Sequence, residues 1–313
     1  MTRDTFSDCH PIVNLYYFAV MLIFSMFLTH LVMLLISLLC ACTYCILQRG
    51  FYKGIWKKIQ LLLPMAAAVI CINTLCNHYG VTTLFYLPGG NAVTLEAAVY
   101  GLVMAVMLTT VLLWFSCWNI VMTTDKFVYL FGRILPGLSL ILTMCFRFIP
   151  CFARQAEQIR KAQKGIGRDL SEGTLRQRLQ RTLNSFSILV TWGLENGIDT
   201  ADSMLARGYG QKGRTAFSLF RLDKRDKKLL VSMTLLLAVL LWGIGAGCAS
   251  AQYNPAIRIS GVPFTLQSAV FYLSYTAFGL LPLSLSYAEK RSWQRLQAGI
   301  AQAGKKGVRL WEL

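Results

Sequence analysis

The sequence predicts an all-α integral membrane protein with about six transmembrane helices and additional long amphipathic cytoplasmic helices. Of its 313 residues, 55% are hydrophobic and 14% are charged, a composition far from that of a soluble globular domain. Several apolar runs approach or exceed the ~20 residues that a helix needs to cross a bilayer. The 31 Lys+Arg residues outnumber the 14 Asp+Glu residues, and they concentrate in a few segments, as cytoplasmic segments of membrane proteins do.

The first apolar stretch, residues 12–47, exceeds the length of one span. The polar pair Thr29-His30 lies near its middle, so the stretch predicts two spans joined by a tight turn. The other four predicted spans are residues 59–76, 93–118, 229–249 and 262–287.

The basic residues predict the orientation of these spans, because Lys and Arg resist translocation and stay in the cytoplasm. Residues 49–58 contain four of them, residues 147–228 contain seventeen and residues 290–309 contain six. The connections 77–92 and 250–261 together contain a single cation, Arg258, and are therefore predicted to be external. Six spans with both termini in the cytoplasm satisfy this distribution.

Four regions follow from these assignments. They are an N-terminal four-span membrane region (residues 1–122), a cytoplasmic coupling-helix region (123–227), two C-terminal spans (228–290) and a basic cytoplasmic tail (291–313). The second region is too polar to span a membrane and too apolar to be a linker. Its apolar run at 135–150 is interrupted by Pro136-Gly137 and predicts a buried or interfacial helix.

From Phe146 onward the pattern predicts a long amphipathic helix with a basic face. Phe148, Phe152 and Ile159 lie on one stripe. A second stripe repeats every seven residues and consists of Arg147, Arg154 and Lys161.

A second amphipathic helix is predicted from about residue 175 to 205. Its apolar stripe has spacings of three and four residues and consists of Leu183, Phe186, Val190, Leu194, Ile198 and Ala201/Leu205. An acidic stripe contains Glu195, Asp199 and Asp202. We expect the two helices to cross with their basic and acidic stripes paired. The alternative is that each stripe faces water, since exposed ion pairs add little stability.

Known catalytic and nucleotide-binding patterns are absent from the sequence. It contains no GxxxxGK[ST] phosphate loop, no HExxH, no GxSxG and no Asp-rich metal motif. The only carboxylate within the six predicted spans is Glu96, so no chain of buried acids is available to relay protons. We therefore expect a non-enzymatic chain that binds no cofactor or metal and takes its energy from elsewhere.

The most specific short motif is Ala206-Arg207-Gly208, at the end of the acidic-striped helix. Glycine is the preferred residue just beyond a helix C-terminus, and a cation in the last turn suits the helix dipole. The planar, permanently charged guanidinium of Arg207 is also suited to an acidic or carbonyl-lined groove of a partner. A helix-ending surface arginine without a function is the alternative.

Several segments in order resemble the transmembrane T component of energy-coupling factor (ECF) ABC transporters, the cobalt-transport permease family. They are His10-Pro11, Thr123 to Phe127, Arg147-Phe148-Ile149-Pro150, Glu157 to Gln163, and Ser203 to Tyr209. The resemblance implies a non-catalytic scaffold in a prokaryotic plasma membrane that has no nucleic-acid partner. Its implied partners are the lipid bilayer, a substrate-binding S component and two ABC ATPase subunits, identical or different, which use ATP and Mg. The implied cargo is a vitamin or metal ion.

In this family each of two coupling helices ends in an Arg-centred motif that docks in an ATPase groove. Arg207 matches the second motif. At the first, Lys164-Gly165-Ile166-Gly167-Arg168 departs from the pattern, with Ile166 at the expected arginine. The resemblance therefore implies that Lys164 or Arg168 supplies the cation, or that this dock is apolar.

Two other function classes remain as alternatives. A membrane-embedded enzyme or assembly factor could gather anionic lipids on the basic cytoplasmic face, but it would require a catalytic constellation. A self-sufficient secondary transporter would be expected to have paired broken helices or buried charges near the midplane.

Overall fold

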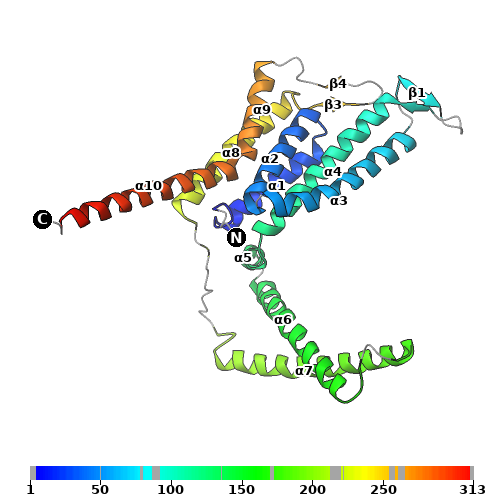
Figure 1. Cartoon of the computed structure of the whole chain (residues 1–313), viewed down its shortest axis with the longest axis vertical. Coiled ribbons are helices and arrows are strands. Elements are labelled where there is room, and N and C mark those ends of the chain that lie inside the picture. Colours follow the sequence, from blue (N-terminus) through cyan, green and yellow to red (C-terminus); the bar gives the residue numbers. More distant parts are fainter. Residues whose placement is uncertain are drawn as a thin grey trace. The chain divides into compact units, whose positions relative to one another are not determined.

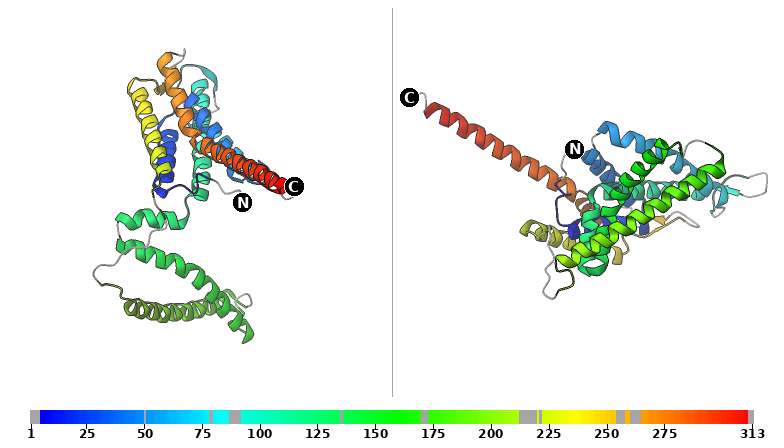
Figure 2. Two further views of the ribbon diagram at one scale, coloured as in Figure 1. Left: turned by 90° about the vertical axis from the view of Figure 1, so that its left-hand side faces the viewer. Right: turned by 90° about the horizontal axis from the view of Figure 1, so that it is seen from below.

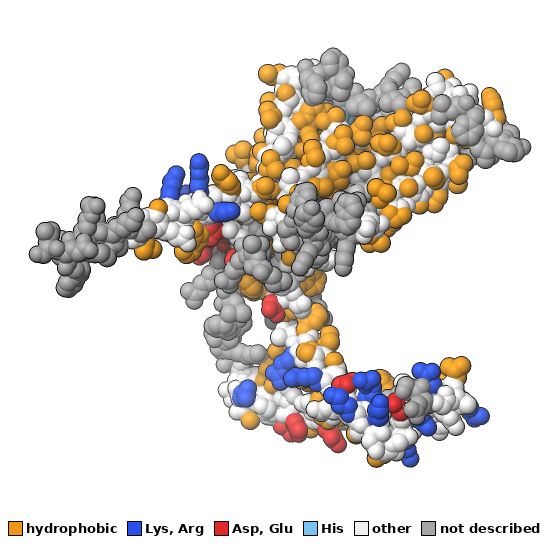
Figure 3. Space-filling model, viewed as in Figure 1, with side chains coloured by type: hydrophobic (Ala, Val, Ile, Leu, Met, Phe, Trp, Pro, Cys, Tyr) orange, Lys and Arg blue, Asp and Glu red, His pale blue; other side chains and the backbone are white. Residues whose placement is uncertain are grey.

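The computed structural model describes residues 5–49, 51–77, 80–86, 92–134, 136–169, 173–211, 220, 222–253, 258–259 and 265–310. The chain forms two compact units (Figure 1). Unit 1 comprises Met1–Thr123 and Phe220–Leu313, and unit 2 comprises Thr124–Leu219. Unit 2 falls within the predicted cytoplasmic region at 123–227. In Figure 3, hydrophobic side chains cover most of the visible face of the helix bundle in unit 1, whereas charged side chains gather on unit 2 and on the segment of unit 1 that extends from the bundle.

The helices of unit 1 confirm the all-α membrane fold. They are α1 Pro11–Phe27, α2 Leu31–Arg49, α3 Phe51–Cys76, α4 Leu95–Val121, α8 Lys224–Gly245, α9 Leu266–Gly279 and α10 Leu281–Leu310. The break between α1 and α2 falls at residues 28–30, where the Thr29-His30 pair predicts a turn. His10 caps α1, because its Nδ1 accepts a hydrogen bond from the Ile12 amide at 3.3 Å.

Three helical segments within the described residues are long and apolar enough to cross a membrane. They are Leu31–Gln48, Leu95–Val121 and Lys224–Gly245. The bent pair Leu266–Gly279 and Leu281–Ala298 makes a fourth if it forms one span, and the bend between its helices is 55°. Two shorter apolar helices, Pro11–Phe27 and Gln60–Cys76, lie at the first and third predicted spans. The total of six spans remains a prediction.

An aromatic core joins α1 to α9 in unit 1. Tyr17 of α1 donates a hydrogen bond to the Gly279 carbonyl at 2.8 Å and stacks on Phe278, with ring centroids 5.5 Å apart. Trp114 of α4 lies edge-on to Tyr17 and donates to the Ser37 hydroxyl of α2 at 2.9 Å. The buried Tyr17 hydroxyl and Trp114 indole thus each have a hydrogen-bond partner, as a low-dielectric interior requires.

Two short hairpins lie in the predicted external connections, where the sequence did not predict strands. β1 Thr83–Tyr86 pairs antiparallel with β2 Ala92–Thr94, and β3 Ala251–Gln252 pairs with β4 Arg258–Ile259. Beside the first hairpin, the Thr82 hydroxyl donates to the Glu96 carboxylate at 2.6 Å. The buried acid at the start of α4 therefore holds the hairpin in place.

In the part of unit 2 that the structure describes there are three helices, α5 Thr124–Ile134, α6 Pro136–Gly165 and α7 Leu175–Ala206. The predicted apolar run at 135–150 and the basic amphipathic helix after Phe146 are one continuous helix, α6, which contains Pro150 in its interior. The predicted second amphipathic helix is confirmed, because α7 begins at Leu175 and ends at Ala206.

The two long helices cross, but at an aromatic contact, whereas the sequence predicted paired charges there. Phe152 of α6 lies edge-on to Trp192 of α7, with ring centroids 5.6 Å apart. A Cβ atom on Gly193 would come within 2.7 Å of the Phe152 ring, so only glycine permits this close approach. Figures 1 and 2 show α6 and α7 diverging on either side of the crossing.

Candidate functional site

The C-terminus of α7 forms a Schellman cap around Arg207. The Tyr209 amide donates to the Met204 carbonyl at 3.0 Å, and the Gly208 amide donates to the Leu205 carbonyl at 2.9 Å. Gly208 has φ of +80°, a left-handed conformation that favours glycine, as the sequence predicts. Ala206 is the last helical residue and Arg207 is the exposed C-cap residue.

The C-terminus of α6 has the same cap. The Arg168 amide donates to the Gln163 carbonyl at 2.9 Å, and the Gly167 amide donates to the Lys164 carbonyl at 3.0 Å. Gly167 has φ of +76°. Ile166 is therefore the C-cap residue of α6, at the position that Arg207 has in α7, and its side chain is 66% exposed. The two helix tips share one backbone geometry and differ in the side chain that they present.

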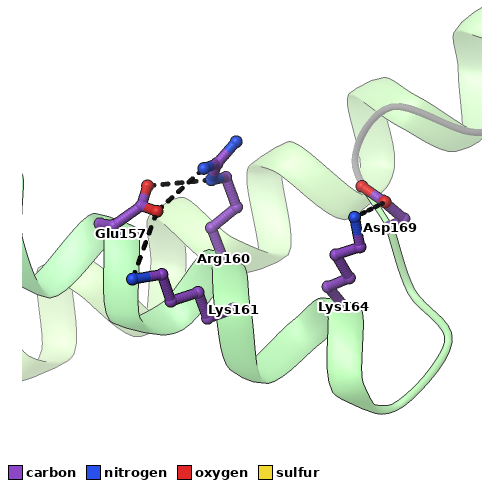
Figure 4. Close-up of polar contacts among 5 residues, drawn as sticks. All are labelled: Glu157, Arg160, Lys161, Lys164 and Asp169. Carbon is purple, nitrogen blue, oxygen red and sulfur yellow. Dashed lines mark hydrogen bonds and ion pairs between the residues drawn. The ribbon is translucent and has the colours of Figure 1, made fainter.

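Several ion pairs lie on the surface of α6 and just beyond its C-terminus (Figure 4). Arg160 donates two hydrogen bonds to the Glu157 carboxylate, at 2.9 and 3.0 Å, and these bonds lower the pKa of Glu157. Lys161 lies 3.7 Å from the same carboxylate. The two cations nearest this tip are Lys164 and Arg168. Lys164 forms an ion pair with Asp169 at 3.4 Å. Arg168 is exposed.

The sequence predicted that the basic and acidic stripes pair across the two helices. None of the ion pairs of the described residues joins the basic stripe (Arg147, Arg154, Lys161) to the acidic stripe (Glu195, Asp199, Asp202). Lys161 pairs within its own helix, and Arg154 donates to the Pro150 carbonyl at 3.3 Å. The helices meet at one crossing and then separate, so charges placed along both stripes cannot all meet. Cross-helix pairing of these residues remains a prediction.

A groove of about 620 Å³ lies between the first half of α6 and the end of α7. Its lining combines charged, hydroxyl and apolar side chains from Leu140, Thr143, Met144, Arg147, Phe148, Asp199, Thr200, Ser203, Met204, Arg207, Gly208 and Tyr209. It brings one member of each predicted stripe, Arg147 and Asp199, to the same site as Arg207. Sequence reasoning missed this groove, although Asp199, Ser203 and Arg207 recur every four residues and hence share a helix face.

The apolar stripe of α7 lies uncovered. All of α7 is described, and none of its 32 residues is buried. The stripe consists of Leu183, Phe186, Val190, Leu194, Ile198 and Leu205, all of which are exposed. A helix contributes to stability mainly by burying such a stripe, and a large exposed apolar surface marks an interaction site. We conclude that α7 is built to contact another surface along its length.

Among the described residues, no cluster of three or more His, Cys, Asp or Glu side chains could hold a metal ion. The site consists of two exposed helix tips, one cationic and one apolar, a mixed groove and an apolar stripe.

Comparison with known proteins agrees with the motifs. The family model described as CbiQ, cobalt transport protein, matches residues 8–218, which include both helix tips. An energy-coupling factor transporter transmembrane protein of Listeria innocua is 37% identical over 106 residues, which cover 34% of this chain and 40% of that protein. Its counterpart in Exiguobacterium sibiricum is 36% identical over 110 residues, 34% of this chain and 42% of that protein.

A longer match involves a transmembrane protein of the same description from Listeria monocytogenes. It is 26% identical over 242 residues, which cover 74% of this chain and 88% of that protein. The matches to the first two relatives span less than half of their lengths. The family resemblance indicated by the sequence motifs is confirmed, and this chain belongs to the CbiQ family of cobalt transport proteins, which includes the ECF T component.

Proposed function

We propose that this chain is the transmembrane coupling subunit of an energy-coupling factor ABC importer in a prokaryotic plasma membrane, with both termini in the cytoplasm. Two ATPase subunits would bind the tips of α6 and α7. A separate membrane-embedded substrate-binding subunit would contact the apolar stripe of α7. Closure of the ATPases on ATP would move the tips, and α7 would transmit that motion to the substrate-binding subunit.

The observation that carries this proposal is α7 itself, an uncovered apolar helix that ends in an exposed arginine. At 1.5 Å per residue, its 32 residues extend about 48 Å. A helix of that length with a capped and charged end can move as one stiff body. Its uncovered stripe supplies an apolar contact surface of the kind that a membrane-embedded partner needs.

The proposal assigns nucleotide chemistry to the partners. This chain contains no phosphate-binding loop, so ATP and Mg would bind to the ATPases, and the present chain would bind no cofactor. The family description supports a metal ion as cargo, and a vitamin is the alternative micronutrient.

The two tips would engage chemically different grooves. Arg207 suits an acidic or carbonyl-lined groove, whereas the exposed Ile166 at the equivalent position suits an apolar one. Lys164 is paired with Asp169, which leaves Arg168 as the flanking cation at the α6 tip. Different grooves favour two different ATPase subunits over two identical ones.

Site-specific photocrosslinking tests this proposal in native membranes. A photoreactive residue at position 166 or 207 should form adducts with two different ATPase subunits, one from each position. The same residue at position 194, on the apolar stripe, should form an adduct with a small membrane protein. Adducts of both tips with one and the same ATPase would contradict the heteromeric pairing, and the absence of ATPase adducts from both positions would overturn the coupling role.

A further inference from the structure

A basic groove lies where α8 and α10 meet in unit 1. It has a volume of about 550 Å³ and is lined by Lys224, Arg225, Lys228, Leu229, Ser232 and Leu285. The groove is therefore lined by three cationic side chains, one hydroxyl group and two leucines. One of the cations is partly neutralised, because Arg225 lies 3.4 Å from Glu289 of α10. The other two have no carboxylate partner among the described ion pairs.

The segment of α10 that follows this groove is amphipathic and strongly basic. Residues 290–310 contain six Lys+Arg residues and no acid. Trp293, Leu296 and Ile300 are exposed by 59%, 59% and 71%, and their spacing of three and four residues places them on one face of the helix. Arg291 and Arg295 lie on the other face. Figures 1 and 2 show this segment extending away from the other helices of unit 1.

Aromatic side chains mark the start of the segment. The Arg291 guanidinium lies over the Tyr287 ring at 5.8 Å from its centroid, and Trp293 follows within two turns. Tyr and Trp concentrate at the boundary between the hydrocarbon and the headgroups of a bilayer. The 55° bend between α9 and α10 turns this segment away from the direction of α9, which belongs to the last apolar helix pair.

We propose that the α8–α10 groove binds the phosphate group of an anionic phospholipid and that residues 290–310 lie on the same bilayer surface. The cations of the groove match the phosphate, and Leu229 and Leu285 match the adjoining acyl chains. A free phosphate ion would leave the leucines unused, so the lipid is the better fit. An interfacial helix with Trp and Leu on one face and Arg on the other extends the same surface. The site lies outside residues 8–218 that match the family model, and it does not depend on the coupling function.

Lipid binding can be measured on the full chain in nanodiscs. One set of discs contains phosphatidylcholine alone, and the other contains phosphatidylcholine with phosphatidylglycerol. Native mass spectrometry counts the phosphatidylglycerol molecules retained per chain, and hydrogen exchange follows the amides of residues 290–310. We expect retained phosphatidylglycerol, and slower exchange only in the mixed discs.

Matched variants locate the site. Lys228→Gln removes a cation that lines the groove, and Lys227→Gln removes its exposed neighbour, which is not among the lining residues. A basic residue near an anionic surface contributes about 1 kcal/mol to the free energy of binding to that surface. Lys228→Gln should therefore weaken phosphatidylglycerol retention about fivefold. Lys227→Gln should weaken it less. Leu296→Asp should abolish the slower exchange, whereas Gln294→Asp, with the same added charge, should preserve most of it.

Three results would overturn the proposal. Equal losses in Lys228→Gln and Lys227→Gln would mean attraction by net charge without a site. Displacement of the lipid by soluble glycerol phosphate at equal concentration would mean that a free phosphate group is the ligand. Slower exchange of residues 290–310 only when ATPase subunits are added would mean that α10 is a protein-binding surface.

Discussion

Ile166 and Arg207 occupy the same C-cap position in two helix ends with identical Schellman hydrogen bonds. The two tips therefore have the same backbone geometry, but the side chain at the C-cap position is a cation in α7 and an apolar group in α6. The difference supports the proposal that the two tips bind different partner surfaces, with each side chain presented in the same backbone geometry.

The Ile166 contact should be sensitive to charge and tolerant of shape. Ile166→Glu should reduce binding of one of the two ATPase subunits at least tenfold, because a carboxylate in an apolar groove loses its hydration. Ile166→Leu should bind within about threefold of wild type, because volume-conserving apolar changes cost little. Pull-down of each ATPase separately measures the effect, and loss of both ATPases in Ile166→Glu would show that the tips do not bind separate subunits.

The cap of α7 should depend on Gly208. Alanine in the left-handed conformation costs about 1 kcal/mol, so Gly208→Ala should speed amide exchange in the last turn of α7 about fivefold. Gly197→Ala is the matched substitution within the helix, where an added Cβ meets nothing within 4 Å. It should slow exchange, because alanine favours helix by about 1 kcal/mol over glycine. Equal effects of the two changes would contradict the cap.

The crossing of α6 and α7 should depend on Gly193. Gly193→Ala brings a methyl group against the Phe152 ring and should cost about 1–3 kcal/mol of local stability through overpacking. Adding Phe152→Leu should recover part of that loss, since the smaller side chain vacates the space. A double-mutant cycle on amide exchange measures the coupling, and strictly additive effects would mean that the two residues do not touch.

Charge exchange should distinguish the groove pair from the rest of the two stripes. Arg147 and Asp199 line one groove, whereas Arg154 donates within its own helix. Arg147→Asp and Asp199→Arg should each impair uptake, and the double variant should recover it at least in part. Arg154→Glu combined with Asp199→Arg should recover nothing. No recovery in either combination would exclude direct pairing of the stripes.

The sequence predicted α7 and the break between α1 and α2 because each has a local signal. The apolar stripe of Leu183, Phe186 and Val190 and the glycine at 208 set the extent of α7, and the Thr29-His30 pair set the break between α1 and α2. The joining of residues 135–150 with the following helix was not predicted, because the run interrupted at Pro136-Gly137 was assigned to a separate buried or interfacial helix. Structure shows that Pro136 is the first residue of α6, where proline needs no amide hydrogen.

The charge pairing and the groove were harder to predict for a geometric reason. Periodicity gives the face of a helix on which Arg147 or Asp199 lies, but it does not give the point at which two helices cross. Gly193 and Phe152 lie at that point, where the absence of a side chain on the glycine lets the Phe152 ring approach the backbone of α7. Charges distant from it, such as Lys161, then find partners within their own helix.

Co-purification of the ATPases with the full chain tests the central claim most directly. Arg207→Glu is compared with Arg176→Glu, a charge reversal at an exposed arginine near the other end of α7. Surface substitutions of this kind change stability by no more than about 1 kcal/mol, so both variants should fold and insert. The account predicts that wild type and Arg176→Glu retain two ATPase subunits and support ATP-dependent uptake, whereas Arg207→Glu loses one subunit and all uptake. Full uptake by Arg207→Glu, or solute transport by the purified chain alone, would contradict it.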